Sequence, residues 1–373
     1  MKKILIFTVG LAVLLCGCGG GNGTASGGDS AAGDSAQKKN LPEKVTIAMT
    51  GDIMMGNTWP HDRLPANDGK NIFDDARDIL KSADVTCGNL EGVIAPPEVG
   101  APRKNQNSPL AFMFKMPPRY VKYLVDCGYD FLGLANNHIY DFFSAPIDYT
   151  EKLLKENGIG FAGAKDPAKK EGNTFWSVKK LNGVTYGFAA FGHERYSPKT
   201  QDTAEVHQII NEVRKQCDVL IIIFHGGAEG SAARHLPEGT ELFHGDDRGN
   251  LRLFTHLCID WGADVVFGAG PHVPRCMELY KGHFIAYSLG NFCTCGMGVS
   301  AQTGLAPLVK IEINPADGLF KNGKIYAFRQ QHMAGPKTDK SGEVIKEIRT
   351  LTQDDIKDGK LNIADDGTIT IKK

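Results

Sequence analysis

Residue types that bind metal ions recur along this sequence, and each group follows a short apolar run. Carboxylate, carboxamide and imidazole side chains stand at these positions, and together they suit Zn, Mn, Fe or Mg. One divalent ion, or two ions close together, would clamp a phosphate-like group and make water more acidic near neutral pH. The candidate ligands are Asp52, Glu91, Asn137, His138, His225 and His272.

Each of these motifs also has a structural explanation when it is taken alone. A Gly-Asp pair is common where a strand ends, and the histidine of the Asn-Asn-His sequence could be satisfied by hydrogen bonds within a turn. His225 could cap the segment that follows it, and His272 beside Pro271 could be structural. The order of the motifs and their shared placement after apolar runs favour one common site.

The apolar runs before the motifs have the length and the β-branched content of strands, and helical patterns alternate with them. Strands are predicted over residues 45–49, 84–87, 131–135, 176–180, 184–191, 219–224, 264–267, 284–288 and 308–313. Helices are predicted over residues 73–82, 117–127, 147–157, 203–216 and 251–261. This alternation indicates an α/β domain whose helices cover the faces of its sheets. Since sites in such sheets form beside the carboxyl ends of strands, the loops that carry the motifs should meet at one edge.

The first residues have the pattern of an export signal. Lys2 and Lys3 precede an apolar run over residues 4–15, which is too short to span a bilayer. The sequence 15–18, Leu-Cys-Gly-Cys, resembles the lipobox of bacterial lipoproteins, with cleavage after Gly17 and a lipid on Cys18. The alternative is an ordinary signal peptide over residues 1–17 with two incidental cysteines. The lipobox predicts an exported protein, anchored in a membrane at the cell surface or on the periplasmic face.

The rest of the chain divides by composition into three predicted parts. Residues 18–43 are expected to be a lipidated cysteine and a flexible linker, because small and polar residues dominate them. Residues 44–335 have globular composition and form the predicted domain, and residues 336–373 are a polar extension with a hairpin around Asp365-Asp366-Gly367. The formal net charge is −1 without a basic block, which argues against nucleic acid as a partner.

Of the nine cysteines, seven follow Cys18, so they cannot all form pairs with one another. Four of them lie within apolar segments, which is typical of small buried side chains. These four are Cys87, Cys127, Cys217 and Cys258. A disulfide from Cys276 to Cys293 or Cys295 is possible in an exported protein, whereas the spacing of these three is not that of a zinc finger.

Taken together, the motifs resemble those of the poly-γ-glutamate capsule biosynthesis family, the CapA type, within the calcineurin-like metallophosphatase superfamily. The matching segments, in the family's order, are Gly51-Asp52-Ile53-Met54-Met55-Gly56, Asn89-Leu90-Glu91, Ala135-Asn136-Asn137-His138 with Asp141, His225-Gly226-Gly227-Ala228-Glu229, Pro271-His272-Val273 and Tyr287-Ser288-Leu289-Gly290-Asn291-Phe292. The resemblance covers about residues 45–330. It implies a four-layer α/β/β/α sandwich, metallophosphatase-like, with a centre of one or two divalent metal ions.

The resemblance also implies roles for single residues. It places the six candidate ligands around the metal, with His138, His225 and Glu229 as catalytic groups. Asn89 and Asp141 follow as further ligands, as partners of the ligands or as substrate contacts. Outside the resemblance, two residues beside the predicted site could contact an anionic substrate, although a solvated loop is the alternative. These are His193, which follows a predicted strand, and Arg248, in the long loop after His225.

The sequence departs from the family pattern at two places. Family members usually carry another histidine shortly before the Pro-His pair, where this chain has Ala269 and Gly270. The usual aromatic residue after His225 is Gly226 here. One of two metal positions could therefore lack a ligand, and a centre with one ion or with none is an alternative.

Two functions follow from these patterns. The first is a metal-dependent hydrolase that acts on a phosphoester or on an envelope polymer such as poly-γ-glutamate. The second is a non-catalytic accessory protein that binds the anionic polymer, or components of its synthase, at the membrane. The cluster after the strands favours the first, and the lipid anchor and the missing histidine favour the second. A structural lipoprotein with a relic site is a third interpretation.

Overall fold

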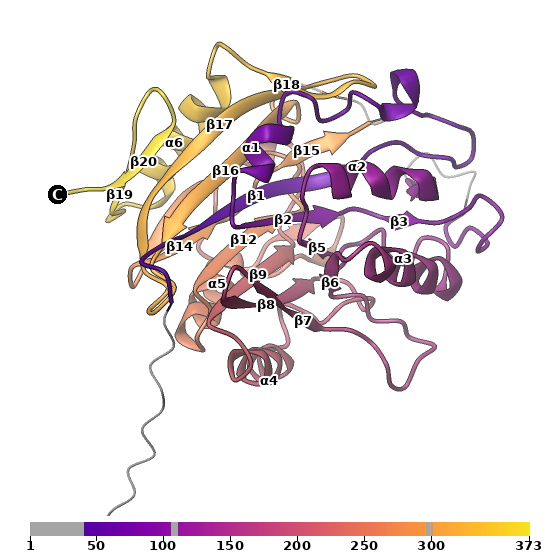
Figure 1. Ribbon diagram of the computed structural model, residues 1–373, viewed down its shortest axis with the longest axis horizontal. Coiled ribbons are helices and arrows are strands. Elements are labelled where there is room, and N and C mark those ends of the chain that lie inside the picture. The colour runs from indigo at the N-terminus through magenta and orange to yellow at the C-terminus, as the bar shows by residue number, and fades with distance from the viewer. Residues whose placement is uncertain (1–40, 106–110, 296–298, 300) are drawn as a thin grey trace, which may run out of the picture. The chain divides into compact units, whose positions relative to one another are not determined.

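The computed structural model describes residues 41–105, 111–295, 299 and 301–373 of the chain. These residues belong to one compact unit, Leu41–Lys373 (Figure 1). The predicted signal sequence, Cys18 and the linker as far as Asn40 lie outside the described residues. None of the described helices is long and apolar enough to cross a membrane.

Two sheets form the centre of the unit, and the larger has ten strands. They are β1 Val45–Met54, β2 Val85–Leu90, β5 Phe131–Gly133, β6 Gly160–Ala162, β15 Asn291–Thr294, β16 Leu305–Ile313, β17 Phe320–Gln331, β18 Gly335–Thr338, β19 Leu361–Ile363 and β20 Thr368–Ile371. Their order is β19-β20-β17-β16-β1-β2-β5-β6, with β15 paired to β1 and β18 paired to β17. Since β1, β2, β5 and β6 are parallel, their carboxyl ends lie along one edge.

The smaller sheet has six strands. They are β7 Trp176–Leu181, β8 Val184–Gly192, β9 Val219–His225, β12 Val265–Ala269, β13 Met277–Tyr280 and β14 His283–Ala286, in the order β13-β14-β12-β9-β8-β7. The four central strands are parallel to one another. Two short pairs lie outside both sheets: β3 Val93–Ile94 with β4 Lys115–Met116, and β10 Leu242–Phe243 with β11 Asp246–Asp247.

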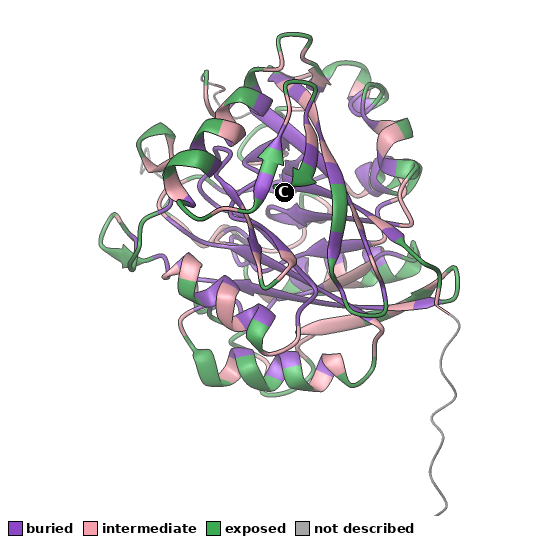
Figure 2. Ribbon diagram, turned by 90° about the vertical axis from the view of Figure 1, so that its left-hand side faces the viewer, coloured by how far each residue is buried: buried purple, intermediate pink, exposed green. Residues whose placement is uncertain are grey.

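Five of the described helices cover the outer faces of both sheets and complete four layers, and the last helix lies on the inner side of the larger sheet, beside β13. The helices are α1 Arg77–Lys81, α2 Val121–Asp126, α3 Ser144–Glu156, α4 Thr203–Arg214, α5 Leu251–Asp260 and α6 Glu343–Asp355, with 3-10 helices η1 Ala66–Gly69, η2 Pro118–Tyr120 and η3 Ser231–Ala233. α1 to α3 pack on the larger sheet, α4 and α5 pack on the smaller one, and α6 lies against β16 and β17 (Figure 1). Figure 2 shows buried strands inside and exposed residues on the outer faces of the helices. The predicted α/β/β/α sandwich is confirmed.

Strand β9 shows why a continuous apolar run forms the middle of this sandwich. Val219, Ile221 and Ile223 point into the core between the two sheets. Leu220 and Ile222 point into the core beneath α4 and α5. Because successive side chains of a strand point to opposite faces, a strand between two apolar layers has to be apolar at every position.

One predicted helix is much shorter in the structure, and one predicted turn is confirmed. The helix expected over residues 73–82 is reduced to α1, and turns occupy the residues before it. There the side chain of Asn71 bonds that of Asp74, and such local hydrogen bonds compete with helix formation. The turn at Asn182-Gly183 joins β7 to β8 in a hairpin, as predicted.

The C-terminal residues contribute to the larger sheet. The predicted boundary at residue 335 falls within the paired strand β18, and α6 places Val344, Ile345 and Ile348 in the core between the sheets. The hairpin expected around Asp365-Asp366-Gly367 is confirmed as β19 and β20, and β20 pairs with β17. Val344, Ile345 and Ile348 lie on one face of α6, and their burial attaches the polar C-terminal segment to the domain.

All seven described cysteines are free. Cys217 is half-buried, and the other six are buried. Cys276 packs in the core beneath α4 and α5, whereas Cys293 and Cys295 pack in the core beneath α1 to α3. A disulfide from Cys276 to either of them is therefore contradicted, because the sheets lie between them.

Aspartates stand just before four of the parallel strands and fix the amino ends of the sheets. Each carboxylate accepts a hydrogen bond from a backbone N–H of the neighbouring strand, in the pairs Asp84–Thr46, Asp130–Thr86, Asp218–Thr185 and Asp264–Leu220. The polar residues at this end of the sandwich are therefore structural.

We expect Asp264→Ala to lower the free energy of unfolding by about 1–3 kcal/mol, because the buried N–H of Leu220 loses its acceptor. Arg214, whose Nη1 lies 2.7 Å from Asp264 Oδ2, loses its charged partner as well and keeps its bonds to backbone carbonyls. Urea denaturation measures the change. Asp260→Ala removes an ion pair with Lys281 and a long hydrogen bond from the Tyr280 hydroxyl, both at the surface, and serves as the matched control. Equal loss in both variants would contradict the structural role of Asp264.

Candidate metal centre

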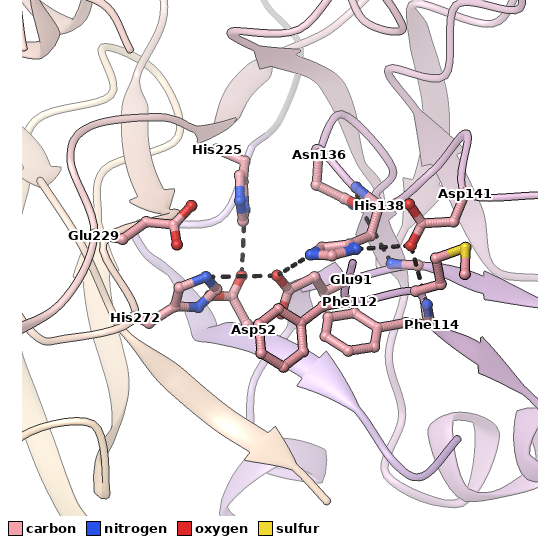
Figure 3. A network of polar contacts seen from close by, with 12 residues as sticks. Asp52, Glu91, Phe112, Phe114, Asn136, His138, Asp141, His225, Glu229 and His272 are labelled. Atoms are coloured by element: carbon pink, nitrogen blue, oxygen red, sulfur yellow. Dashed lines mark hydrogen bonds and ion pairs between the residues drawn. The ribbon is translucent and has the colours of Figure 1, made fainter. Parts of the chain in front are cut away.

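Side chains from both sheets converge where the parallel strands end. Asp52 lies near the end of β1, and Glu91 directly follows β2. His138 lies in the loop after β5, His225 ends β9, and His272 lies in the loop after β12. All are buried, and Figure 3 shows them facing one another.

Asp52 is held by the strands on both sides of it. It stands opposite Asn89 on β2 and Asn291 on β15 in the parallel pairing. Its Oδ1 accepts a hydrogen bond from Asn89 Nδ2 at 2.7 Å, and its Oδ2 lies 3.1 Å from His272 Nδ1. Burial alone would raise the pKa of Asp52, but hydrogen bonds with His225 and His272 outweigh it and hold the pKa well below its usual value. Asp52 is therefore an ionised carboxylate.

Glu91 is buried, and neither of its oxygens has a hydrogen-bond partner among the residues that the structure describes. Oε1 lies 3.6 Å from His272 Nε2 and 3.9 Å from His138 Nε2. Burial raises the pKa of Glu91 to about 8, although the positive charge of His272 opposes this effect. An unpaired carboxylate at such a place costs free energy unless a cation compensates it.

His272 is oriented by Asn291. Its Nδ1 lies 2.9 Å from Asn291 Oδ1, which can only accept, so Nδ1 carries a proton and Nε2 faces Glu91. Burial would lower the pKa of His272, but the charges of Glu91 and Asp52 outweigh it and raise the pKa to about 10. The backbone of His272 has a φ of 58°, a left-handed conformation that is strained for this residue type.

Asn136 and Asn137, in the loop after β5, differ in their hydrogen bonds. Asn136 Nδ2 donates to the carbonyl of Leu90 at 2.8 Å, and its Oδ1 accepts from two backbone N–H groups. These bonds tie the loop to the segment that carries Glu91. Asn137, the predicted ligand, has a buried Oδ1 for which the described residues supply no hydrogen-bond donor.

His138 is fixed by Asp141, Phe114 and Lys104. Its Nδ1 lies 2.7 Å from Asp141 Oδ2, its ring packs 4.1 Å from the ring of Phe114, and Lys104 Nζ lies 2.8 Å from Asp141 Oδ1. Burial lowers the pKa of His138 to about 4, against the raising effect of Asp141. The neutral ring donates from Nδ1 to Asp141, so Nε2 is an acceptor that faces Glu91.

His225 and His193 line the side of the centre that belongs to the smaller sheet. His225 Nδ1 lies 3.2 Å from Asn89 Nδ2, and its Nε2 is buried without a hydrogen-bond partner in the described part of the chain. His193 Nδ1 lies 3.3 Å from the carbonyl oxygen of His225. Burial, followed by the charge of Arg248, lowers the pKa of His193 to about 3. His193 is therefore neutral.

The loop after β9 carries Glu229 and Arg248, which pair with each other at 2.9 Å. Arg248 is buried and its charge is compensated, so it is not a free cation for an anionic substrate. Beneath the loop, Arg275 contacts both carboxylate oxygens of Glu241 at 2.8 and 2.6 Å, and both residues are buried. Glu241 also accepts the N–H of Ala228, so this pair holds the loop beside the centre.

The donor atoms at the centre fit a divalent cation. Glu91, His225 and His272 each place one ligand atom within 4.8 Å of the others, and no second group of His, Cys, Asp or Glu meets this criterion in the described ranges. Asn89 Oδ1 and Asn137 Oδ1 add buried acceptors without partners in the same part of the chain. Carboxylate, amide and imidazole ligands suit Zn, Mn, Fe or Mg. A cation would also compensate the buried carboxylate of Glu91.

The two departures from the family pattern lie in contact with each other. Gly270 has a φ of 115°, and a Cβ on it would lie 2.6 Å from the carbonyl oxygen of Gly226. The N–H of Gly226 donates to the carbonyl of Ala269 at 3.0 Å. Because the two backbones touch here, this arrangement leaves no room for a histidine at position 270.

Three residues of the site were not predicted to be functional. Asn291 belongs to the quoted Tyr-Ser-Leu-Gly-Asn-Phe segment, so its position in a motif was the available signal. Asn136 adjoins the predicted ligand Asn137 and differs from it only in its hydrogen bonds. Lys104 stands in a loop without a recognisable pattern, and only the fold brings it to Asp141.

Comparisons with known proteins agree with this fold and with the placement of the motifs. Residues 46–295 match the model of a family described as bacterial capsule synthesis protein PGA_cap. The chain is 27% identical over 267 residues to the capsule biosynthesis protein CapA of Bacillus anthracis, a match that covers 67% of this chain and 60% of that protein. It is 26% identical over 264 residues to the PGA biosynthesis protein CapA of Bacillus subtilis (strain 168), with 66% and 63% covered. It therefore spans less than two thirds of either relative.

Among solved structures, a protein described as a novel phosphatase from Mycoplasma pneumoniae superposes with a TM-score of 0.51. The match covers 78% of this chain and 96% of that chain, at 14% sequence identity. At this identity the likeness concerns the fold alone. The α/β/β/α sandwich is thus metallophosphatase-like.

Proposed function

The chain belongs to the bacterial capsule synthesis protein family PGA_cap, and from this premise we propose that it is a metal-dependent hydrolase of an envelope polymer or a phosphoester. The metal would be Mn, Zn, Fe or Mg.

One observation carries this proposal. Both oxygens of Glu91 are buried near two histidines, and within the described part of the chain they have no hydrogen-bond partner. A structural carboxylate in a protein interior is paired or hydrogen-bonded. Without a metal, the charge of His272 compensates Glu91 only in part, and no hydrogen bond completes it. The arrangement therefore supports a working metal site over a relic.

Each side chain around the centre then has a chemical task. A divalent ion held by Glu91, His225 and His272 would polarise a phosphoryl or carbonyl oxygen and make water more acidic. His138 Nε2 would accept a proton and return it to the leaving group. Asp141 holds the His138 ring through Nδ1, so that Nε2 keeps facing the centre.

Loss of metal binding in Glu91→Gln tests the centre directly. We expect the purified protein to contain a divalent metal and the variant to contain none, because the amide cannot compensate the charge of the cation. At a hundredfold excess over Kd the metal should add about 2.7 kcal/mol to the stability of the wild type and nothing to that of the variant. Elemental analysis and thermal unfolding with and without added Mn²⁺ or Zn²⁺ measure both effects.

A matched variant controls for damage to the fold. Glu312→Gln changes a carboxylate at the surface, where Glu312 pairs with Lys44, and should keep the metal. The metal-free Glu91→Gln protein should still unfold in one cooperative transition, because glutamine keeps the size of the side chain, while the buried His272 loses the charge of Glu91. Metal retained in Glu91→Gln at the wild-type level would overturn the assignment of the centre.

Export and anchoring are part of the same proposal. The lipobox pattern supports a lipid on Cys18, which would place the activity outside the cytoplasmic membrane. An anionic envelope polymer such as poly-γ-glutamate, or components of its synthase, would then be the partner, and the name of the Bacillus subtilis relative supports this class. Mass spectrometry of the mature N-terminus should find an acylated Cys18. A mature N-terminus at another residue would refute the anchor.

A non-catalytic accessory protein is the second candidate, and the backbone contact between Gly226 and Gly270 favours it. That contact excludes a side chain at position 270, one of the two positions where the resemblance leads us to expect a histidine, so the centre would lack a ligand of a two-metal site. Binding of poly-γ-glutamate to the metal-free protein, unchanged by Glu91→Gln and without turnover, would support this candidate. Turnover that requires Glu91 would exclude it.

A further inference from the structure

A pocket of about 260 Å³ lies next to the metal centre on the side of the smaller sheet. It is lined by His193, Glu194, Lys199, Gln201, Asp246 and Asp247. Two segments form it: the residues that follow β8, and strand β11. None of these residues belongs to the group of three that could hold a metal ion.

His193 joins the pocket to the metal centre. Its ring stacks against the ring of His225 with 6.3 Å between the centroids, and the same residue lines the pocket. Only 5% of His193 is exposed. Because its Nδ1 faces the carbonyl oxygen of His225 at 3.3 Å, that nitrogen carries the proton and Nε2 is left as an acceptor. Nε2 is buried, and the described residues offer it no hydrogen bond.

The other walls of the pocket are acceptors as well. Glu194, Asp246 and Asp247 contribute three carboxylates, against the single ammonium group of Lys199. The amide nitrogen of Gln201 already donates to the carbonyl of Asp247 at 2.8 Å. Glu194 Oε1 lies 3.7 Å from His193 Nε2, too far for a hydrogen bond. A ligand that fits this lining has to bring its own N–H or O–H groups.

A metal ion and a polycarboxylate both fit the pocket poorly. Among the described residues, its acidic and imidazole groups do not come together within the distance that a bound ion requires. A glutamate polymer would bring further carboxylates to the three of the lining, where like charges repel even though Asp246 and Asp247 are exposed to solvent. Hydroxyl and ammonium groups, in contrast, donate to such acceptors, and hydrogen bonds to charged groups are the stronger ones.

We propose that this pocket is a substrate subsite and that it takes a hydrogen-bond-donating unit, bearing hydroxyl or ammonium groups, of a substrate whose anionic group lies at the metal centre. The inference rests on the proposed function and narrows its substrate. A phosphate ester of a sugar or amino sugar fits both parts of the site, whereas poly-γ-glutamate fits the metal centre alone. His193, between the two parts, contacts the donating unit through Nε2.

Titration of the metal-loaded protein with glucose, glucosamine and a γ-linked glutamate trimer, followed by NMR, tests the subsite. Glucose or glucosamine should bind and the trimer should not, and the comparison of the two sugars separates hydroxyl from ammonium recognition. Asp246→Asn should weaken the binding of the sugar about tenfold, since one charged acceptor is lost. Asp246 is exposed and its carboxylate makes no contact that the fold needs, and Glu194→Gln provides a second variant.

Asp358→Asn, an equal change of charge at an exposed residue far along the chain, should leave the affinity for the sugar unchanged. The subsite is overturned if neither sugar binds. It is also overturned if the glutamate trimer binds and Asp246→Asn strengthens that binding. Hydrolysis of p-nitrophenyl phosphate is measured separately. Sugar binding without hydrolysis of this ester or of poly-γ-glutamate would refute the proposed function and keep the subsite. Hydrolysis without sugar binding would refute the subsite and keep the proposed function.

Discussion

Replacement of His138 by alanine should lower the turnover of a phosphoester by about 10²- to 10⁴-fold, the usual contribution of a general acid or base. The variant should keep its metal, because the group that could hold the ion consists of Glu91, His225 and His272. Steady-state kinetics with p-nitrophenyl phosphate and elemental analysis of the same preparation measure the two effects together.

The geometry around His138 explains why so large an effect is expected. Asp141 accepts from Nδ1 at 2.7 Å, and the ring of Phe114 packs against the imidazole at 4.1 Å. Both contacts leave Nε2 directed at Glu91, 3.9 Å away. An imidazole with one nitrogen bound and the other free at a buried centre is placed to move a proton. The methyl group of alanine can neither accept a proton nor donate one.

Two further variants separate proton transfer from structure. Asp141→Asn keeps the size of the side chain but weakens its hold on Nδ1, so we expect a smaller loss of turnover than in His138→Ala. His61→Ala changes an exposed histidine and should have wild-type turnover. If His138→Ala loses its metal together with its activity, His138 is a ligand, as the motif alone allowed, and its role in proton transfer is refuted.

Much of the fold could be predicted because its signals are local. The apolar run over β9 alternates between two cores, and Asn182-Gly183 sits at a turn that requires such residues. Strand β17 and helix α6 were not predicted. In α6, Val344, Ile345 and Ile348 have helical spacing, but the many charged residues between them concealed the buried face.

The candidate site was predictable to the extent that strand ends carry its residues. Because parallel strands of one sheet end at a common edge, Asp52 and Glu91 could be placed together from the sequence. His225 ends a strand of the smaller sheet, and the order of the motifs was the signal that placed it with them. The residues that orient the side chains of the metal centre could not be predicted in this way. Asn291 reaches His272 from β15, and Lys104 reaches Asp141 from a loop, and neither separation follows a periodic rule.

The pairing of Arg248 is a second feature that could not be predicted from the sequence. A cation in a loop beside the site suits an anionic substrate, and this was the prediction. In the structure Arg248 pairs with Glu229 and lies over the ring of Phe243, and only 6% of it is exposed. Pairing depends on the path of the loop between residues 226 and 250, which the composition does not determine. Glu229, predicted as catalytic, is correspondingly engaged with Arg248.

The second large effect concerns the pair that holds this loop. We expect Arg275→Met to lower the free energy of unfolding by about 3–5 kcal/mol, because it leaves Glu241 as an uncompensated buried charge. Arg275 is fully buried, and besides Glu241 it donates to the carbonyl oxygens of Ala233 and Ala228. Urea denaturation of the purified protein measures the loss. Proteolysis within residues 226–250 should also accelerate, since the loop loses its anchor.

Removal of both charges should cost less than removal of one. In Arg275→Met with Glu241→Met no buried charge remains, and apolar side chains of similar volume often replace such pairs at little cost. Arg234→Met is the matched control, because Arg234 pairs with Glu347 at 3.8 Å and both are partly exposed, so a much smaller change is expected. If Arg275→Met is no more destabilising than Arg234→Met, the buried pair does not hold the loop. If the double variant is as unstable as Arg275→Met, the loss comes from the bonds to Ala233 and Ala228, and the unpaired charge of Glu241 is not its cause.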